Sequence, residues 1–242
     1  MDADTLIRNL RKPEAWPEPV QAIDLCETHA AWVLMSDTTA YKIKKPVDFG
    51  FLDYSSLEKR RFYCEEELRL NQRLAPGIYR DVVPITGTPQ APVFGGSGTA
   101  LEYAVRMRRF AAGGLLSELA ARDELTSTII DALAVLVADF HTCAASAPTD
   151  SHYGTAAQVH HWVRENFSHI VDARPALESD TRLQHLRRWS EQEYERLAAH
   201  FEQRRAAGAI RECHGDLHLG NITLDAGRVT PFDCIEFNPE LR

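Results

Sequence analysis

The feature that most constrains this chain is a short polar loop near its C-terminal end. Residues 214–221 read His-Gly-Asp-Leu-His-Leu-Gly-Asn, and a Phe-Asp pair follows at 232–233. Asp216 and Asn221 are five residues apart, and Asp233 lies twelve residues beyond Asn221. Carboxylate and amide oxygens suit Mg²⁺, which binds a few such groups together with substrate phosphates. A separate aspartate can accept the proton of an attacking hydroxyl, so the spacing predicts a phosphate-handling site with metal ligands and a base.

An Asp with an Asn five residues later and a further metal-binding Asp is the plan of the kinase catalytic loop. Residues 214–221 resemble the catalytic loop of the aminoglycoside phosphotransferase family, which reads H-G-D-x-x-x-x-N and has the protein-kinase-like fold. Residues 41–53 and 233–238 resemble an uncharacterised bacterial branch of that family, whose members often carry a second, P-loop kinase domain downstream. The resemblance runs from about Ile23 to the C-terminus.

The resemblance implies an enzyme that transfers the γ-phosphoryl group of ATP to a hydroxyl of a small molecule, with ATP and Mg²⁺ as cofactors. It makes Asp216 the base and makes Asn221 and Asp233 the Mg²⁺ ligands, while His214 braces the loop. Besides the small-molecule acceptor, it suggests a fused or separate P-loop kinase domain as a partner. The chain ends nine residues after Asp233, whereas similar kinases continue with helices that shape the acceptor pocket. We therefore expect either a C-terminal truncation or a reduced acceptor site.

The order of hydrophobic patterns predicts a β-rich first lobe followed by an α-rich second lobe, and the resemblance implies that these form an α+β, two-lobed protein-kinase-like fold. Short β-type runs dominate the first part of the chain with one helix inserted, and helical spacing dominates from Gly113 onward. We expect a small antiparallel-sheet N-lobe that binds nucleotide over residues 1–110. A mostly helical C-lobe over residues 111–242 would hold the catalytic loop and a metal-binding hairpin. The predicted elements are a hairpin over 31–35 and 39–43, a strand over 100–107, helices over 57–74, 126–143, 159–170 and 183–201, and a late hairpin around 226–227.

A kinase-like site also needs a cation on the nucleotide phosphates. Lys42 and Lys44 alternate with Tyr41 and Ile43 on one predicted strand, so both lysines face the same side. The kinase pattern V-A-I-K aligns with residues 41–44 and favours Lys44 as the phosphate clamp, with Lys42 as the alternative.

In kinases this lysine pairs with a glutamate of the next helix. Residues 65–67 are three consecutive glutamates on the predicted helix. Apolar residues follow the family's glutamate at +3 and +7, and Leu70 and Leu74 therefore favour Glu67, with Glu66 as the alternative.

The nucleotide's other contacts have weaker signals. The strand that ends at Met107 would supply the hinge between the lobes, and the resemblance places Tyr103, Val105 and Met107 near the adenine base. The glycine-rich G-x-G-x-x-G loop of protein kinases is missing from residues 27–32, where it would be expected. In this segment only Thr28 and His29 are candidates for residues that cover the phosphates. A G-x-x-x-x-G-K-[ST] loop is also absent, which argues against a Walker-type ATPase.

Two other classes of function compete with the kinase interpretation. A nucleotide-binding regulatory module without turnover fits the missing phosphate loop. A metal-dependent hydrolase would use His214, Asp216 and His218, although zinc sites usually need three or four clustered ligands and no further Cys or His lies nearby.

Composition narrows the partners and the compartment. The 242 residues carry 27 Lys and Arg against 35 Asp and Glu, a formal charge of −8, so clustered positive charge for nucleic-acid binding is not expected. No apolar run reaches about 20 residues, so we expect no membrane span. Five scattered cysteines and an N-terminus without a signal-peptide pattern favour the cytoplasm.

Overall fold

The computed structural model describes residues 3–242, and its central feature is an antiparallel sheet of six strands. The strand order is β1-β2-β3-β6-β4-β5, so β3 and β6 are the central pair. The strands are β1 (Asp24–Glu27), β2 (Ala31–Met35), β3 (Thr39–Lys44), β4 (Tyr79–Thr88), β5 (Ala91–Phe94) and β6 (Glu102–Arg108). The mixed α+β architecture with a curled antiparallel sheet in its first part confirms the predicted fold class.

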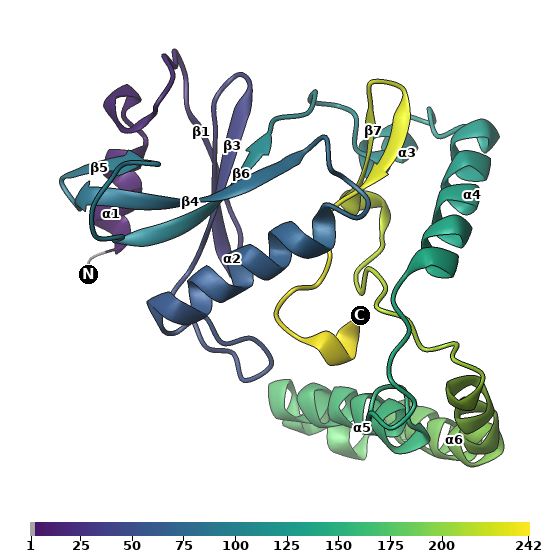
Figure 1. The fold of residues 1–242 in the computed structure, drawn as a ribbon. Helices are drawn as coiled ribbons and strands as arrows, with labels where there is room; N and C mark the ends of the chain where they lie inside the picture. Colours follow the sequence, from purple (N-terminus) through teal and green to yellow (C-terminus); the bar gives the residue numbers. More distant parts are fainter. Residues whose placement is uncertain (1–2) are drawn as a thin grey trace. The chain divides into compact units, whose positions relative to one another are not determined.

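Each face of this sheet is covered by a different helix (Figure 1). On one face, α1 (Ala3–Leu10) and the short helix η1 (Pro13–Ala15) pack on Tyr41, Ile43 and other apolar side chains. On the other face, α2 (Leu57–Asn71) packs through Cys64 on a cluster that includes Val105. Because side chains alternate along a strand, Lys42 and Lys44 point away from the α1 core and toward the side of α2.

A second, smaller sheet follows the predicted catalytic loop. It is the hairpin of β7 (Ile222–Asp225) and β8 (Arg228–Pro231), with Ala226 and Gly227 at its turn. Its apolar side chains pack with α3 (Leu116–Ala121) and with the first half of α4 (Ser127–Cys143). Figure 1 shows the yellow hairpin beside α3 and the C-terminal segment running back toward α2.

The chain divides into two compact units, and the division differs from the predicted boundary at residue 110. Residues up to Phe140, together with His214–Arg242, form the first unit, so α3, most of α4 and the β7–β8 hairpin group with the six-stranded sheet. Residues 141–213 form the second unit. Whether the nucleotide-binding and catalytic parts separate at residue 110 stays a prediction.

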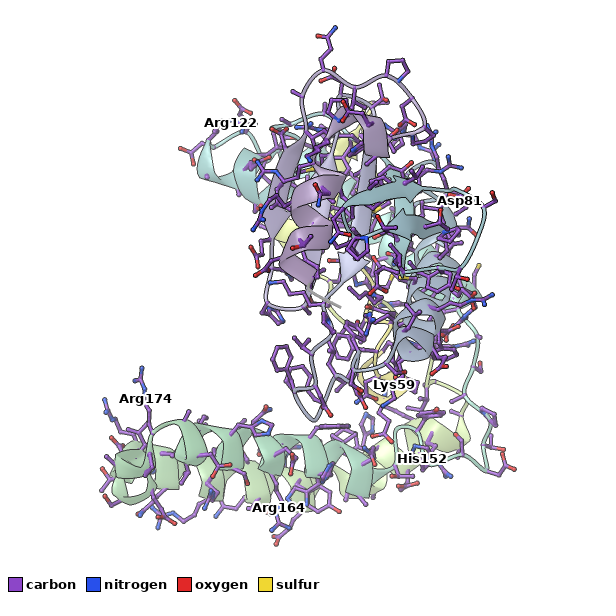
Figure 2. All side chains as sticks on the ribbon, turned by 90° about the vertical axis from the view of Figure 1, so that its left-hand side faces the viewer. Lys59, Asp81, Arg122, His152, Arg164 and Arg174 are labelled. Carbon is purple, nitrogen blue, oxygen red and sulfur yellow. The ribbon has the colours of Figure 1, made fainter. Side chains whose placement is uncertain are left out.

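The second unit is a pair of helices with a small core. α5 (Ala156–Ala173) and α6 (Thr181–Ala206) are joined by the short helix η2 (Pro175–Ser179), and Phe167 is buried between them. His160 stacks on Tyr194 with ring centroids 3.8 Å apart. Figure 2 shows the side chain of Arg164 projecting from α5 and that of Arg174 projecting from the position directly after this helix. Across residues 3–242, no helix has the combination of length and apolar character that crossing a bilayer requires.

Candidate active site

The β7–β8 hairpin places the two predicted metal ligands at the same end. Asn221 directly precedes β7, and Phe232 directly follows β8. The backbone N–H of Phe232 donates to the carbonyl oxygen of Asn221 at 2.9 Å, which extends the pairing of the two strands by one step. Asp233, the next residue, therefore lies beside Asn221 although twelve residues separate them.

Asp216 and Asn221 contact each other within the loop. The Nδ2 group of Asn221 donates to the backbone oxygen of Asp216 at 3.0 Å and to its Oδ2 atom at 3.1 Å. Since Nδ2 is used in this way, Oδ1 is the atom of Asn221 that is left for a cation. The side chain of Asp216 is 55% exposed, so its carboxylate is open to a ligand.

His214 supports the loop through two hydrogen bonds of its imidazole ring. Its side chain is buried, its Nε2 atom lies 2.9 Å from the carbonyl oxygen of Phe232, and its Nδ1 atom accepts the N–H of Asp216 at 3.3 Å. These two contacts assign the proton to Nε2, which donates to Phe232. Burial lowers the pKa of His214, and the neutral ring is the form that both hydrogen bonds require. The imidazole thus ties the catalytic loop to the end of the hairpin.

The backbone of Asp233 is strained. Its φ angle is +63°, in the left-handed region that non-glycine residues seldom adopt, although Asp tolerates it better than most. Its N–H donates to the hydroxyl of buried Tyr79 at 3.3 Å. Strain of this kind persists where the surrounding structure holds it, and it is common at functional sites. Here it turns the carboxylate of Asp233 toward β3.

Lys42 connects this carboxylate to α2. Its Nζ atom lies 2.5 Å from Oδ1 of Asp233 and 2.9 Å from Oε1 of Glu67. Lys44 pairs with the other oxygen of Glu67, Oε2, at 2.7 Å. Both predicted lysines therefore share the predicted glutamate, while Glu66 pairs with Arg69.

The two lysines differ in burial. The side chain of Lys42 is 15% exposed and borders Asp233, which is 39% exposed. Lys44 is 1% exposed, and its Nζ atom also contacts Glu236 and the hydroxyl of Tyr54. Lys42 is therefore the lysine that a phosphate beside Asp233 could reach, which differs from the preference of the V-A-I-K alignment for Lys44.

Burial and neighbouring charges have opposite effects on the pKa values of Lys42, Lys44 and Glu67. Burial by itself would lower the pKa of Lys42, but the carboxylates of Asp233 and Glu67 raise that pKa well above its usual value. Glu236 and Glu67 raise the pKa of Lys44 in the same way, also against the effect of burial. Burial would raise the pKa of Glu67, yet the two ammonium groups hold it at about 2. Lys42, Lys44 and Glu67 are therefore charged at neutral pH.

The predicted adenine residues have different surroundings. Tyr103, Val105 and Met107 are on the face of β6 that packs with the α2 side. Val105 is fully buried opposite Lys42, and Tyr103 lies under the guanidinium of Arg61. Met107 is half-buried near the end of the strand.

The hydroxyl of Thr28, a candidate for covering the phosphates, is hydrogen-bonded within the turn between β1 and β2. The Thr28 hydroxyl oxygen accepts the N–H of Ala31 at 3.0 Å and the N–H of Ala30 at 3.4 Å, so it caps its own turn. His29 at the tip is exposed and lies 6.0 Å from the ring of Phe49.

Histidine-based metal binding is not supported by the geometry. Both ring nitrogens of His214 have protein partners, and Nδ1 of His218 accepts the N–H of Gly220 at 3.0 Å. Within residues 3–242, no group of three or more His, Cys, Asp or Glu side chains is arranged to hold a metal ion. Mg²⁺, which binds one or two protein groups and substrate phosphates, fits the oxygen donors of Asn221 and Asp233 better than zinc does.

Sequence reasoning missed three residues of the site. Glu236 pairs with Lys44, Tyr54 contacts both of these residues, and Tyr79 supports Asp233. Glu236 lies in the segment 233–238 that carried part of the resemblance, but its spacing from Lys44 of 192 residues leaves no local signal. Tyr54 directly follows the segment 41–53 that also carried part of the resemblance, whereas Tyr79 lies in none of the motifs.

Comparisons with known proteins identify relatives and a family for this chain. Uncharacterized proteins of Mycobacterium bovis and of two strains of Mycobacterium tuberculosis are each 29% identical over 223 residues. The matches cover 91% of this chain but 43% of each relative, so the chain spans less than half the length of these relatives. No solved structure matches the chain. The model of the phosphotransferase enzyme family matches residues 61–232, which include most of α2 and the loop at residues 214–221. The chain therefore belongs to the phosphotransferase enzyme family.

Proposed function

We propose that this chain is an ATP-dependent phosphotransferase that moves the γ-phosphoryl group to a hydroxyl of a small molecule. The observation that carries the proposal is that ionisable side chains from distant parts of the chain come together at the end of the β7–β8 hairpin. Lys42 of β3 joins Glu67 of α2 to Asp233, directly beside the contact between Asn221 and Asp216. A cation, metal-binding oxygens and an exposed carboxylate are the groups that phosphoryl transfer requires.

Each residue would have one role. Lys42 would contact the phosphates, and Lys44 would support it from the buried side. Oδ1 of Asn221 and the carboxylate of Asp233 would hold Mg²⁺, whose charge offsets that of the phosphates. Met107 and the segment that follows β6 would lie along the adenine.

Asp216 would act on the acceptor. As the acceptor oxygen bonds to the γ-phosphorus and the bond to the β-phosphate oxygen breaks, ADP leaves and the hydroxyl proton passes to the Asp216 carboxylate. The contact with Asn221 fixes the direction of this carboxylate, and its exposure leaves room for an acceptor.

The proposal also includes a small acceptor and a fused or separate P-loop kinase domain as a partner, both of which the family resemblance implies. The scattered cysteines and the N-terminus without a signal-peptide pattern support a location in the cytoplasm. The longer mycobacterial relatives leave room for such a domain, because the match covers 43% of their length.

The test is ATP binding measured by calorimetry with and without Mg²⁺, followed by phosphate release in the presence of a panel of hydroxyl-bearing metabolites. We expect binding that depends on Mg²⁺ and that is lost in Asp233→Ala. Asp131→Ala, which removes an exposed carboxylate of α4, is the matched control and should bind as the wild type does. ATP binding without any turnover on any acceptor would favour the regulatory module, and no nucleotide binding would refute the proposal.

A further inference from the structure

Glu236 is a buried carboxylate that the proposed reaction does not use. It lies three residues after Asp233 and is 6% exposed. Its Oε1 atom accepts hydrogen bonds from Nζ of Lys44 and from the hydroxyl of Tyr54. Burying a charged carboxylate costs free energy unless the carboxylate is paired and hydrogen-bonded.

Glu236 balances the charge of a buried cluster that consists of Lys42, Lys44, Glu67 and Glu236. The two ammonium groups of Lys42 and Lys44 face two buried carboxylates, Glu67 and Glu236, and these four charges cancel. Asp233 is then a third carboxylate beyond this balance, and it is the most exposed of the three. A balanced buried cluster leaves Asp233 free to exchange Lys42 for a divalent cation.

The sharing of Glu67 makes the two lysines depend on each other. Each lysine contacts one oxygen of Glu67, and each has a second carboxylate of its own, Asp233 for Lys42 and Glu236 for Lys44. Without the charge of Glu236, Lys44 would have only Glu67, and it would draw that carboxylate away from Lys42. Lys42 would then rely more strongly on Asp233.

The backbone around Glu236 is anchored on two sides. The N–H of Cys234 donates to Oδ1 of Asn71 at 3.0 Å, and the N–H of Ile235 donates to the carbonyl oxygen of His214 at 2.9 Å. Arg242 donates to the carbonyl oxygens of Ile235 and Glu236 at 3.2 and 3.0 Å. The Glu236 side chain links this segment to β3 through Lys44, in addition to the link that Asp233 makes through Lys42.

We propose that Glu236 is a positioning residue: through Lys44 it keeps Glu67 and Lys42 in place and holds the segment after Asp233 against β3. This inference rests on the proposed function for its effect on catalysis, whereas its structural part does not. The central variant is Glu236→Gln, which keeps the size and hydrogen-bonding capacity of the side chain and removes its charge.

The first measurement is hydrogen exchange at the amides of Cys234 and Ile235, which needs no substrate. We expect exchange in Glu236→Gln to accelerate about tenfold or more at these two amides, while amides in β5 keep their wild-type rates. Glu58→Gln, which removes an exposed carboxylate of α2, is the matched control and should leave all rates unchanged. Unchanged protection of Cys234 and Ile235 in Glu236→Gln would overturn the inference.

The second measurement separates a charge pair from a merely buried side chain. In the double variant Lys44→Met, Glu236→Gln, both charges are removed and Glu67 serves Lys42 alone. Breaking one half of a buried pair costs more than removing the whole pair, so exchange should return toward the wild-type rates. Faster exchange in the double variant than in the single one would contradict the role of Lys44.

The third measurement addresses catalysis. The Mg²⁺ concentration that gives half-maximal ATP turnover should rise about 10–100-fold in Glu236→Gln, the usual cost of losing a group that orients a metal ligand. A wild-type concentration dependence on Mg²⁺ in this variant would refute the catalytic part of the inference. If the wild type itself neither binds nor turns over ATP, the proposed function fails, and the exchange measurements still decide whether Glu236 holds the segment.

Discussion

The buried charged cluster and the exposed catalytic loop use the same kinds of side chain in opposite ways. The cluster, which consists of Lys42, Lys44, Glu67 and Glu236, pairs every charge with a protein partner away from water. The loop at residues 214–221 leaves the carboxylate of Asp216 exposed, with Asn221 as its main side-chain partner. Paired charges hold backbone segments together, whereas open oxygens can accept a metal or a proton.

Asp233 and Lys42 lie where these two regions meet. Asp233 belongs to the hairpin end that carries the loop, yet its carboxylate pairs with a lysine of the cluster. The comparison shows that Glu67 and Glu236 are buried and paired with lysines, whereas Asp216 and Asp233 are the carboxylates that reach solvent. We therefore expect variants of the exposed loop to lose activity and variants of the buried cluster to lose stability.

The largest effect on activity is expected on the exposed side. Asp216→Asn should lower kcat for ATP turnover about 10²–10⁴-fold, because an amide keeps the shape of the side chain but cannot accept the hydroxyl proton. ATP affinity and melting temperature should stay close to those of the wild type, since the carboxylate is exposed. Asp172→Asn on α5 is the control. Wild-type turnover in a folded Asp216→Asn protein would remove the base assignment.

The largest effect on stability is expected on the buried side. Glu67→Gln removes the carboxylate that both lysines share, and leaving buried charges without a partner typically costs about 3–5 kcal/mol. Urea unfolding should show this loss at pH 7. Glu65→Gln, at an exposed position of the same helix, should unfold at the wild-type urea concentration. Equal unfolding midpoints for the two variants would mean that the cluster does not stabilise the fold.

The two lysines allow a direct comparison of the two regions, and we expect smaller effects on ATP binding and on stability than in the variants above. Lys42→Met should weaken MgATP binding roughly 10–100-fold, the usual worth of one hydrogen bond to a charged group, with a modest change in stability. Lys44→Met should mainly lower the urea midpoint, because its ammonium is buried between Glu67 and Glu236. Calorimetry and urea unfolding of both variants decide the matter. If Lys44→Met weakens ATP binding more while unfolding normally, the V-A-I-K alignment is correct and our reassignment to Lys42 is wrong.

The smallest effect is a pH dependence at His214, the buried support of the exposed loop. Its pKa lies below the usual 6.5 in the folded state, so the unfolded chain binds the proton more readily. This contribution to the free energy of unfolding is complete above pH 6.5 and is lost as the pH falls below that value. Urea unfolding at pH 8.0, 6.5 and 5.0 should show the decline.

The variant His214→Gln tests the source of that decline. Gln keeps a donor that can reach Phe232 but cannot titrate, so the slope of stability against pH should flatten below pH 6.5. A slope equal to that of the wild type would assign the pH dependence to other groups.

Local spacing predicted the loop and the late hairpin, and together with the family resemblance it predicted the fold class. Asp216 and Asn221 are close because five residues in a tight loop cannot separate them far, and the β7–β8 register brings Asp233 beside Asn221. The predicted helices at 57–74, 126–143 and 183–201 correspond to α2, α4 and α6, because each apolar stripe repeats at the helical period. The assignment of Glu67 used the same periodicity, and Glu67 is the glutamate that contacts the lysines.

Only the packed structure could separate Lys42 from Lys44 or reveal Glu236. Strand alternation places both lysines on one face of β3, so their sequence environments are nearly equivalent. Which of them borders Asp233 depends on how the end of the β7–β8 hairpin docks against β3, a contact between residues 191 positions apart. Glu236 pairs with Lys44 across a similar separation. Such contacts depend on the combined packing of sheet, helix and hairpin, and no local pattern in the chain encodes that arrangement.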